Sequence, residues 1–134
     1  LDKCHVTPAT IRKVIDKHNP IQVWGDGKEI RDIIYIDDFV DGLVTVLDNC
    51  KEKYEIVNIG SNENYTINEI LHKCMEIEKN DTPIKYISGK PSMIPIRKIS
   101  SNKMKEKYSW ERKHSLEQGL KKTIDWYKEY YIGE

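Results

Sequence analysis

The stretch VWGDGKEIRDIIYIDD, residues 23–38, organises the first half of this chain. It begins inside a short β-rich segment, Ile21–Trp24, which the glycine turn Gly25–Gly27 ends. Arg31 then stands at the start of a second apolar segment that continues to Ile36. The stretch therefore predicts two short strands joined by a tight turn.

A helix is predicted directly after this stretch. Asp37 or Asp38 could cap its first turn, since a carboxylate can accept hydrogen bonds from free backbone N–H groups there. Apolar residues then recur at helical spacing, which predicts that one face packs inward. The residues of that face are Val40, Leu43, Val44 and Leu47.

Helices and strands alternate through the rest of the chain. The predicted elements are a helix begun by Thr7 and Pro8, a strand over Glu55–Ile59, a helix capped by Thr66 and Glu69, a strand over Ile84–Ile87, and a last helix capped by Ser115 and Gln118. Short strands between helices predict an α/β fold, specifically a small mixed lobe of short strands and helices rather than a free-standing doubly wound sheet.

Composition excludes several partners. The chain has 134 residues, with 22 Lys and Arg against 22 Asp and Glu, so its formal net charge is zero. Binding to nucleic acid or to an anionic membrane normally needs a basic excess, and no apolar run approaches the roughly 20 residues of a membrane span. Cys4, Cys50 and Cys74 are widely spaced, which favours free thiols in a cytoplasmic protein over a disulfide framework or a zinc site.

Motifs for cofactor chemistry are absent from the sequence. Its seven glycines form no dinucleotide or phosphate fingerprint, so we expect this chain alone to bind no cofactor. Tyr86 and Lys90 have the spacing of a catalytic Tyr/Lys pair on a helix. The intervening Gly89 and the following Pro91 disfavour that helix.

The stretch over residues 23–38 resembles the V-x-G-D-G-x-x-x-R-D-x-x-[YH]-[VI]-x-D segment of extended short-chain dehydrogenases/reductases, the NAD-dependent nucleotide-sugar epimerase/dehydratase family. Further segments match that family in the same order along the chain. They are HVTPATIRK (5–13), NIGS (58–61), PIRK (95–98), and YSW (108–110) with SLEQGL (115–120).

The resemblance implies that residues 1–134 form the C-terminal, nucleotide-sugar-binding lobe of such an enzyme. We expect its NAD(P)-binding Rossmann domain to lie outside this chain, with NAD or NADP bound there and a Tyr/Lys pair transferring protons. The substrate would be a GDP- or UDP-linked sugar, the chain alone would be inactive, and a homodimer is possible. One alternative is a stand-alone module that binds sugar nucleotides, or pairs with a separate Rossmann chain, without enzymatic activity. Another is a fragment with no function of its own.

The resemblance also implies roles for individual residues. Arg31 and Arg97 would clamp the diphosphate, because guanidinium groups bind phosphate oxygens in pairs. The alternative for both is an ordinary solvated or salt-bridged arginine, with Asp32 as an available partner. Trp24 would stack on the base or pack in the local core. Three further positions each have a local alternative: Val6 and Pro8 would line the base pocket or pack at the helix start, and Lys13 would reach a phosphate or stay solvated.

His5 distinguishes branches of the family. GDP-L-fucose synthases have His-Val-x-Pro at this place, and the resemblance implies that His5 acts as acid and base in epimerisation, which suits an imidazole. The Arg31-Asp32-Ile33-Ile34-Tyr35 segment is closer to 4-epimerases and dehydratases. The alternative is a histidine that caps or packs locally.

Overall fold

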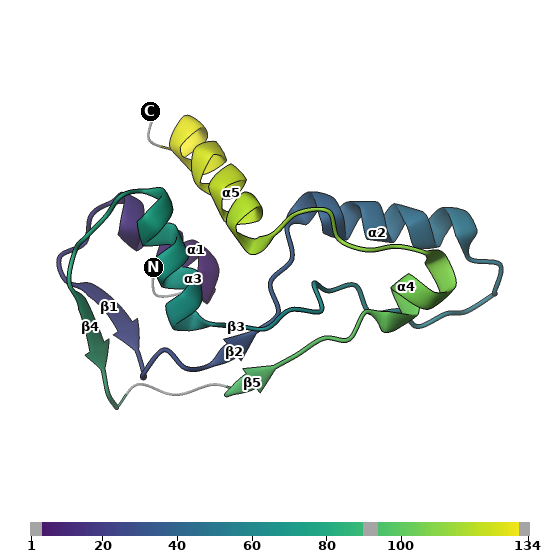
Figure 1. Cartoon of the computed structure of the whole chain (residues 1–134), viewed down its shortest axis with the longest axis horizontal. Coiled ribbons are helices and arrows are strands. Elements are labelled where there is room, and N and C mark those ends of the chain that lie inside the picture. The colour runs from purple at the N-terminus through teal and green to yellow at the C-terminus, as the bar shows by residue number, and fades with distance from the viewer. Residues whose placement is uncertain (1–3, 90–93, 132–134) are drawn as a thin grey trace.

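The computed structural model describes residues 4–89 and 94–131. Its elements, in chain order, are α1 (Val6–Ile15), β1 (Ile21–Trp24), β2 (Ile30–Arg31), α2 (Ile36–Asn49), β3 (Tyr65–Thr66), α3 (Ile67–Ile77), β4 (Ile84–Ile87), β5 (Ile96–Arg97), α4 (Asn102–Tyr108) and α5 (Leu116–Tyr131). Figure 1 shows β1, β4, α1 and α3 grouped at one end, α2 and α4 at the other, and β2, β3 and β5 between them. The predicted mixed α/β lobe of short strands and helices is confirmed.

The hydrophobic core lies where α1, α3 and α5 meet the parallel pair β1–β4. Alternate residues of β1 face this core, so Ile21 and Val23 are buried while Gln22 and Trp24 are exposed. Aliphatic side chains of this kind each contribute about 1.5–3 kcal/mol when fully buried. The buried members are Ile11, Val14, Ile21, Val23, Ile67, Ile70, Leu71, Cys74, Leu120 and Ile124.

A second sheet has the strand order β3–β2–β5. β2 pairs antiparallel with β3 and parallel with β5. The second strand, predicted from Arg31 to Ile36, forms at Ile30–Arg31 instead and shares only Arg31 with the prediction, because the chain leaves the sheet after Arg31.

Two helices begin with the caps that the sequence predicts, and two others begin at different residues. Thr66 with Glu69, and Ser115 with Gln118, form the predicted reciprocal caps. The N-cap of α1 is His5, not Thr7, and the N-cap of α2 is Tyr35. Asp37 and Asp38 lie instead in the first turn of α2, where a negative charge interacts favourably with the helix dipole.

The predicted inward face of α2 is wrong. Val40, Leu43, Val44 and Leu47 are all exposed, Leu47 to 70%. α2 instead turns its polar and small side toward the rest of the molecule: Asp38 is buried, and a Cβ on Gly42 would lie 3.0 Å from Trp110 and from Ile59. The spacing predicted the helix correctly but not which side is covered.

The predicted strand over Glu55–Ile59 is also wrong. No described strand lies beside it, so its alternating pattern has no ladder to join. Glu55 is held by α4 instead, through ion pairs with Lys103 and Lys107 and a 2.9 Å hydrogen bond from the Tyr108 hydroxyl. Within the described residues, no helix is both long and apolar enough to cross a membrane.

Candidate functional site

β2 and β5 bring two arginines together that are 66 positions apart in the sequence. Arg31 and Arg97 are register partners in the parallel pair, so their side chains leave the sheet on the same face from strands about 4.8 Å apart. Arg31 donates from Nη1 to its neighbour's carbonyl oxygen, on Ile30, at 2.7 Å, and Arg97 is exposed. Neither guanidinium forms an ion pair with any residue in the described ranges.

Asp32 does not pair with Arg31, so the ion pair that the sequence allowed between them is absent. Its backbone N–H donates to the carbonyl oxygen of Arg97 at 3.1 Å, which closes the ladder between the two strands. Its Oδ1 accepts the N–H of Ser61 at 2.9 Å, and its Oδ2 is buried with no hydrogen-bond partner among the described residues. Asp32 therefore fastens the strands that carry the arginines and leaves their charges uncompensated.

The glycine turn before β2 is fixed against the start of α3. Gly27 has a φ of 70°, and a Cβ there would lie 2.0 Å from Oδ1 of Asn68, so only glycine fits. Asn68 in turn donates its backbone N–H to the Gly27 carbonyl at 3.0 Å and its amide to Asp26 at 3.1 Å. Trp24, just before the turn, is 51% exposed, which contradicts the alternative of a buried core residue.

The predicted residues of α1 are spread over different surroundings. His5 is exposed at the N-cap and its side chain makes no capping hydrogen bond. Val6 is partly buried against the core, and Pro8 is exposed. Lys13 donates to the backbone carbonyl of Gln22 at 2.8 Å, and burial lowers the pKa of its ammonium group, so it is not simply solvated.

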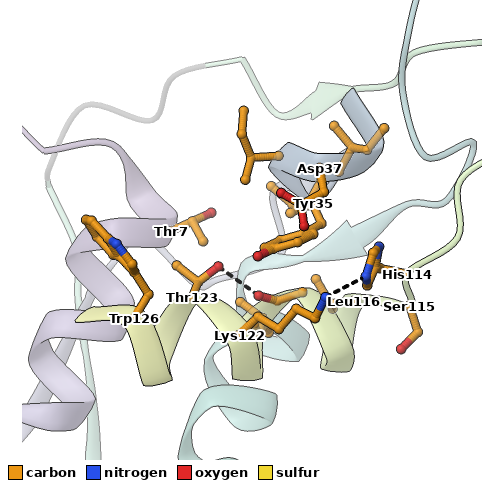
Figure 2. A pocket seen from close by; sticks show the side chains of 14 residues that line it. Thr7, Tyr35, Asp37, His114, Ser115, Leu116, Lys122, Thr123 and Trp126 are labelled. Carbon is orange, nitrogen blue, oxygen red and sulfur yellow. Dashed lines mark hydrogen bonds between the residues drawn. The ribbon is translucent and has the colours of Figure 1, made fainter. Parts of the chain in front are cut away.

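A cavity of about 560 Å³ lies between the β2–α2 connection, the first turn of α1 and one side of α5 (Figure 2). Its walls include the rings of Tyr35 and Trp126, with Thr7 and Lys122 among its polar groups. None of the seven predicted site residues lines it, although Thr7, Asp37 and Ser115, which the sequence marked as helix starts, do. No sequence motif marks this cavity, because its lining residues come from segments that only the tertiary fold joins.

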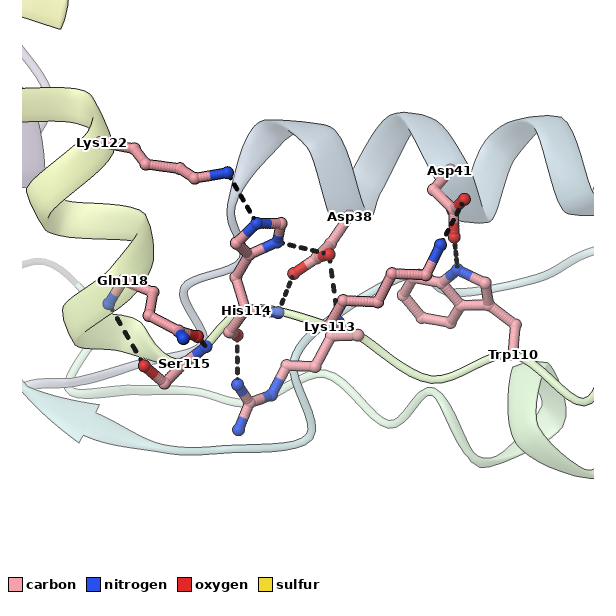
Figure 3. Close-up of polar contacts among 9 residues, drawn as sticks. Asp38, Asp41, Trp110, Lys113, His114, Ser115, Gln118 and Lys122 are labelled. Atoms are coloured by element: carbon pink, nitrogen blue, oxygen red, sulfur yellow. Dashed lines mark hydrogen bonds and ion pairs between the residues drawn. The ribbon is translucent and has the colours of Figure 1, made fainter.

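Beside the cavity, a chain of polar contacts runs from α2 to α5 (Figure 3). Asp38, only 1% exposed, accepts the backbone N–H groups of Lys113 at 3.1 Å and His114 at 3.0 Å. Its Oδ1 also lies 2.9 Å from Nδ1 of His114, and Nε2 of that ring lies 2.9 Å from Nζ of Lys122. A lysine ammonium can only donate, so the imidazole accepts at Nε2 and donates from Nδ1 to Asp38.

These contacts determine the charge state of Asp38. Burial raises the pKa of its carboxyl, but hydrogen bonds from the ring and N–H of His114 and from the N–H of Lys113 outweigh burial, so the pKa lies below its ordinary value. Lys122 also lies 5.3 Å from the centroid of the Tyr35 ring, within reach of a cation–π contact. The arrangement fixes the relative positions of α2, the loop before α5 and α5 itself.

Comparison with known proteins gives consistent matches. The model of the NAD dependent epimerase/dehydratase family matches residues 1–60. UDP-glucuronate 4-epimerase of Thermodesulfobacterium geofontis is 32% identical over 87% of this chain and 36% of its own length. GDP-L-fucose synthase 1 of Arabidopsis thaliana is 32% identical over 94% of this chain and 40% of its own length.

Solved structures show the same likeness. The crystal structure of UDP-glucose 4-epimerase from Thermotoga maritima, with UDP-glucose, superposes with a TM-score of 0.85 at 28% identity and covers 95% of this chain and 40% of that protein. The chain thus spans about two fifths of the length of the relatives that it matches. It belongs to the NAD-dependent epimerase/dehydratase family and corresponds to the C-terminal part of the family's longer members.

Proposed function

We propose that this chain is the nucleotide-sugar-binding lobe of an NAD(P)-dependent epimerase, reductase or dehydratase, and that Arg31 and Arg97 bind the diphosphate of the substrate. The observation that carries the proposal is their register pairing without a counter-charge. Like charges directly opposite each other on neighbouring strands destabilise a sheet. A diphosphate between them would remove that cost.

The charge distribution supports binding of an anion at these two arginines rather than over a broad basic surface. The formal net charge of the chain is zero, so no broad basic surface attracts phosphates. Two guanidinium groups on adjacent strands offer paired donors to neighbouring phosphate oxygens. Each such charge-assisted hydrogen bond contributes about 1.5–3 kcal/mol.

The structure supports the other predicted site residues to different degrees. Trp24 presents half of its surface at the end of β1, which suits stacking on a base. Val6 and Pro8 would border the base, and exposed His5 would act as acid and base once the reacting sugar is brought beside it. The bond from Lys13 to Gln22 weighs against a phosphate contact by that lysine.

The cofactor is proposed to lie outside this chain. The sequence holds no glycine-rich dinucleotide-binding motif. NAD or NADP would therefore be bound by the N-terminal lobe, which would supply the hydride acceptor. This chain would contribute recognition of the nucleotide diphosphate.

Titration calorimetry tests the arginine pair. UDP-glucose and GDP-mannose are titrated into the wild-type chain and into Arg31→Ala, Arg97→Ala and Arg12→Ala. Arg12 is the matched control, an exposed arginine on α1 that pairs with Asp16. We expect Arg31→Ala and Arg97→Ala each to weaken binding at least about tenfold, the lower value for one charged hydrogen bond. Unchanged affinity in both variants would refute the proposal, and the preferred sugar nucleotide would identify the base.

A further inference from the structure

The cavity beside α5 is separate from the residues assigned to the nucleotide sugar. Its volume of about 560 Å³ lies within the range of small-molecule sites, which are concave, mostly apolar and carry a few placed polar groups. Figure 2 shows Tyr35 and Trp126 on opposite sides of it, with Thr7 and Thr123 between them. Aliphatic side chains complete the lining, among them Ile33, Leu116 and Leu120.

The Tyr35 ring, which forms one wall, is held in place by three neighbours. The ring centroid of His114 lies 4.9 Å from the centroid of Tyr35, and Nζ of Lys122 lies 5.3 Å from it. Gly119 leaves room for the ring, because a Cβ at that position would lie 3.1 Å from Cβ of Tyr35. The wall is therefore formed before any ligand arrives, which lowers the entropy cost of binding.

Lys122 is a cation fixed at the edge of this cavity. Its Nζ lies 2.9 Å from Nε2 of His114, and Nδ1 of that ring lies 2.9 Å from the buried carboxylate of Asp38. The contact with His114 uses one of the three ammonium donors, so two remain. Lys122 forms no ion pair with any residue in the described ranges, and the charge of Asp38 reaches it only through the imidazole.

The groups that line the cavity indicate the chemistry of its ligand. Two aromatic walls favour a flat ring. Burial, together with the charges of Asp37 and Asp38, raises the pKa of Tyr35, so its hydroxyl stays protonated at neutral pH and can donate a hydrogen bond. Within the described residues, neither this hydroxyl nor that of Thr7 has a hydrogen-bond partner. These donors and the ammonium of Lys122 favour an anionic acceptor at one end of the ring.

We propose that this cavity is a separate binding site for a small planar aromatic carboxylate, with the ring between Tyr35 and Trp126 and the carboxylate on Lys122. A single lysine matches the one charge of a carboxylate, whereas the paired guanidinium groups of Arg31 and Arg97 match a diphosphate. The site goes beyond the proposed function, because none of the residues assigned to the nucleotide sugar lines it.

An NMR titration with 2-naphthoate tests the site, since amide and indole signals report both affinity and location. We expect the indole N–H of Trp126 and the amides of residues 33–36 and 114–123 to shift, and the amides of the exposed apolar face of α2, residues 39–47, to keep their positions. The neutral 2-naphthamide, which has the same ring, should bind at least about tenfold more weakly, the lower value for one charged hydrogen bond. Octanoate, which has the charge without the ring, should also bind more weakly than 2-naphthoate.

Variants test the charge and the ring wall separately. Lys122→Met should remove the preference for 2-naphthoate over 2-naphthamide. Lys121→Met is the matched control, because it removes a neighbouring lysine that pairs with Asp125, and it should keep that preference. Trp126→Leu should weaken both ligands and leave the amide spectrum outside the cavity as in the wild type, since this side chain is half exposed. Asp37→Asn should tighten 2-naphthoate, because it removes a negative charge from the lining.

The proposal is overturned if 2-naphthamide binds as tightly as 2-naphthoate, if the preference for the carboxylate survives in Lys122→Met, if the shifts concentrate on residues 39–47, or if no signal shifts. Competition with UDP-glucose separates this site from the proposed function. Saturating UDP-glucose should leave the affinity for 2-naphthoate unchanged, whereas displacement would show that the cavity is part of the sugar-nucleotide site and would overturn the proposal.

Discussion

Asp38→Asn should cost this protein much of its stability although it changes one atom. The carboxylate accepts two backbone N–H groups and the Nδ1 donor of His114. The amide group of asparagine has one acceptor oxygen, so its NH₂ must face at least one of these donors. Losing a hydrogen bond to a charged group costs about 1.5–3 kcal/mol, and the buried donor left without a partner adds about 1–3 kcal/mol.

We therefore expect a loss of about 3 kcal/mol in the free energy of unfolding. For a chain of this length that corresponds to a fall of roughly 10 °C in melting temperature. Urea unfolding followed by tryptophan fluorescence measures it, since buried Trp110 contacts α2 through Asp41. Asp37→Asn is the matched control: its exposed carboxylate in the same helical turn should contribute only about 0.5 kcal/mol through the helix dipole.

The pH dependence of the stability tests the role of Asp38 in a second, independent way. The pKa of Asp38 is lower in the folded protein than in the unfolded chain, where it is about 3.9. The contribution of Asp38 to the free energy of unfolding is therefore present above the unfolded pKa and is lost as the pH falls through the folded pKa. The stability difference between wild type and Asp38→Asn should therefore be constant near neutrality and shrink below about pH 4. Equal effects of Asp38→Asn and Asp37→Asn, or a difference that does not shrink in acid, would refute the reasoning.

Two further predictions concern the contacts around α2. Hydrogen bonds from Lys103, Lys107 and Tyr108 lower the pKa of Glu55 to about 2. The stability that the ionised Glu55 contributes should therefore be lost as the pH falls from about 4.5 to about 2. In a pH titration of unfolding, Glu55→Gln should not show this loss. Gly42→Ala should gain up to about 1 kcal/mol of helix propensity but lose about 1–3 kcal/mol by overpacking, because the new Cβ lies 3.0 Å from Trp110 and Ile59. A higher free energy of unfolding in urea for Gly42→Ala than for the wild type would show that the indole of Trp110 can move to make room.

The sequence predicted those elements whose partners lie within the chain. β1 was predicted with its observed bounds, whereas the exposure of Trp24 at its end was left open. The capping box of Thr66 and Glu69 was also predictable, because both of its hydrogen bonds join residues three apart. Such local chemistry does not depend on what lies elsewhere in the fold.

Parts of the candidate site depend on distant residues and were less accessible. Arg31 and Arg97 were singled out from motifs, but nothing in either motif says that they are register partners. The contact of Asp38 with His114 joins residues 76 positions apart, and only the fold reveals it. A lone histidine in a loop gives no sign of the carboxylate that orients it.

Two of the errors, the inward face of α2 and the strand over Glu55–Ile59, have one physical cause. Hydrophobic spacing predicts which residues will be buried, but it does not say by what. Val40, Leu43, Val44 and Leu47 are exposed and residues 55–59 have no strand partner, because no described element packs on that side of α2 or pairs with that segment. Such patterns are costly to leave unsatisfied, since exposed apolar surface and free strand edges promote association. Both errors therefore concern what a segment packs against, which local spacing cannot assign, whereas the helix itself was predicted correctly.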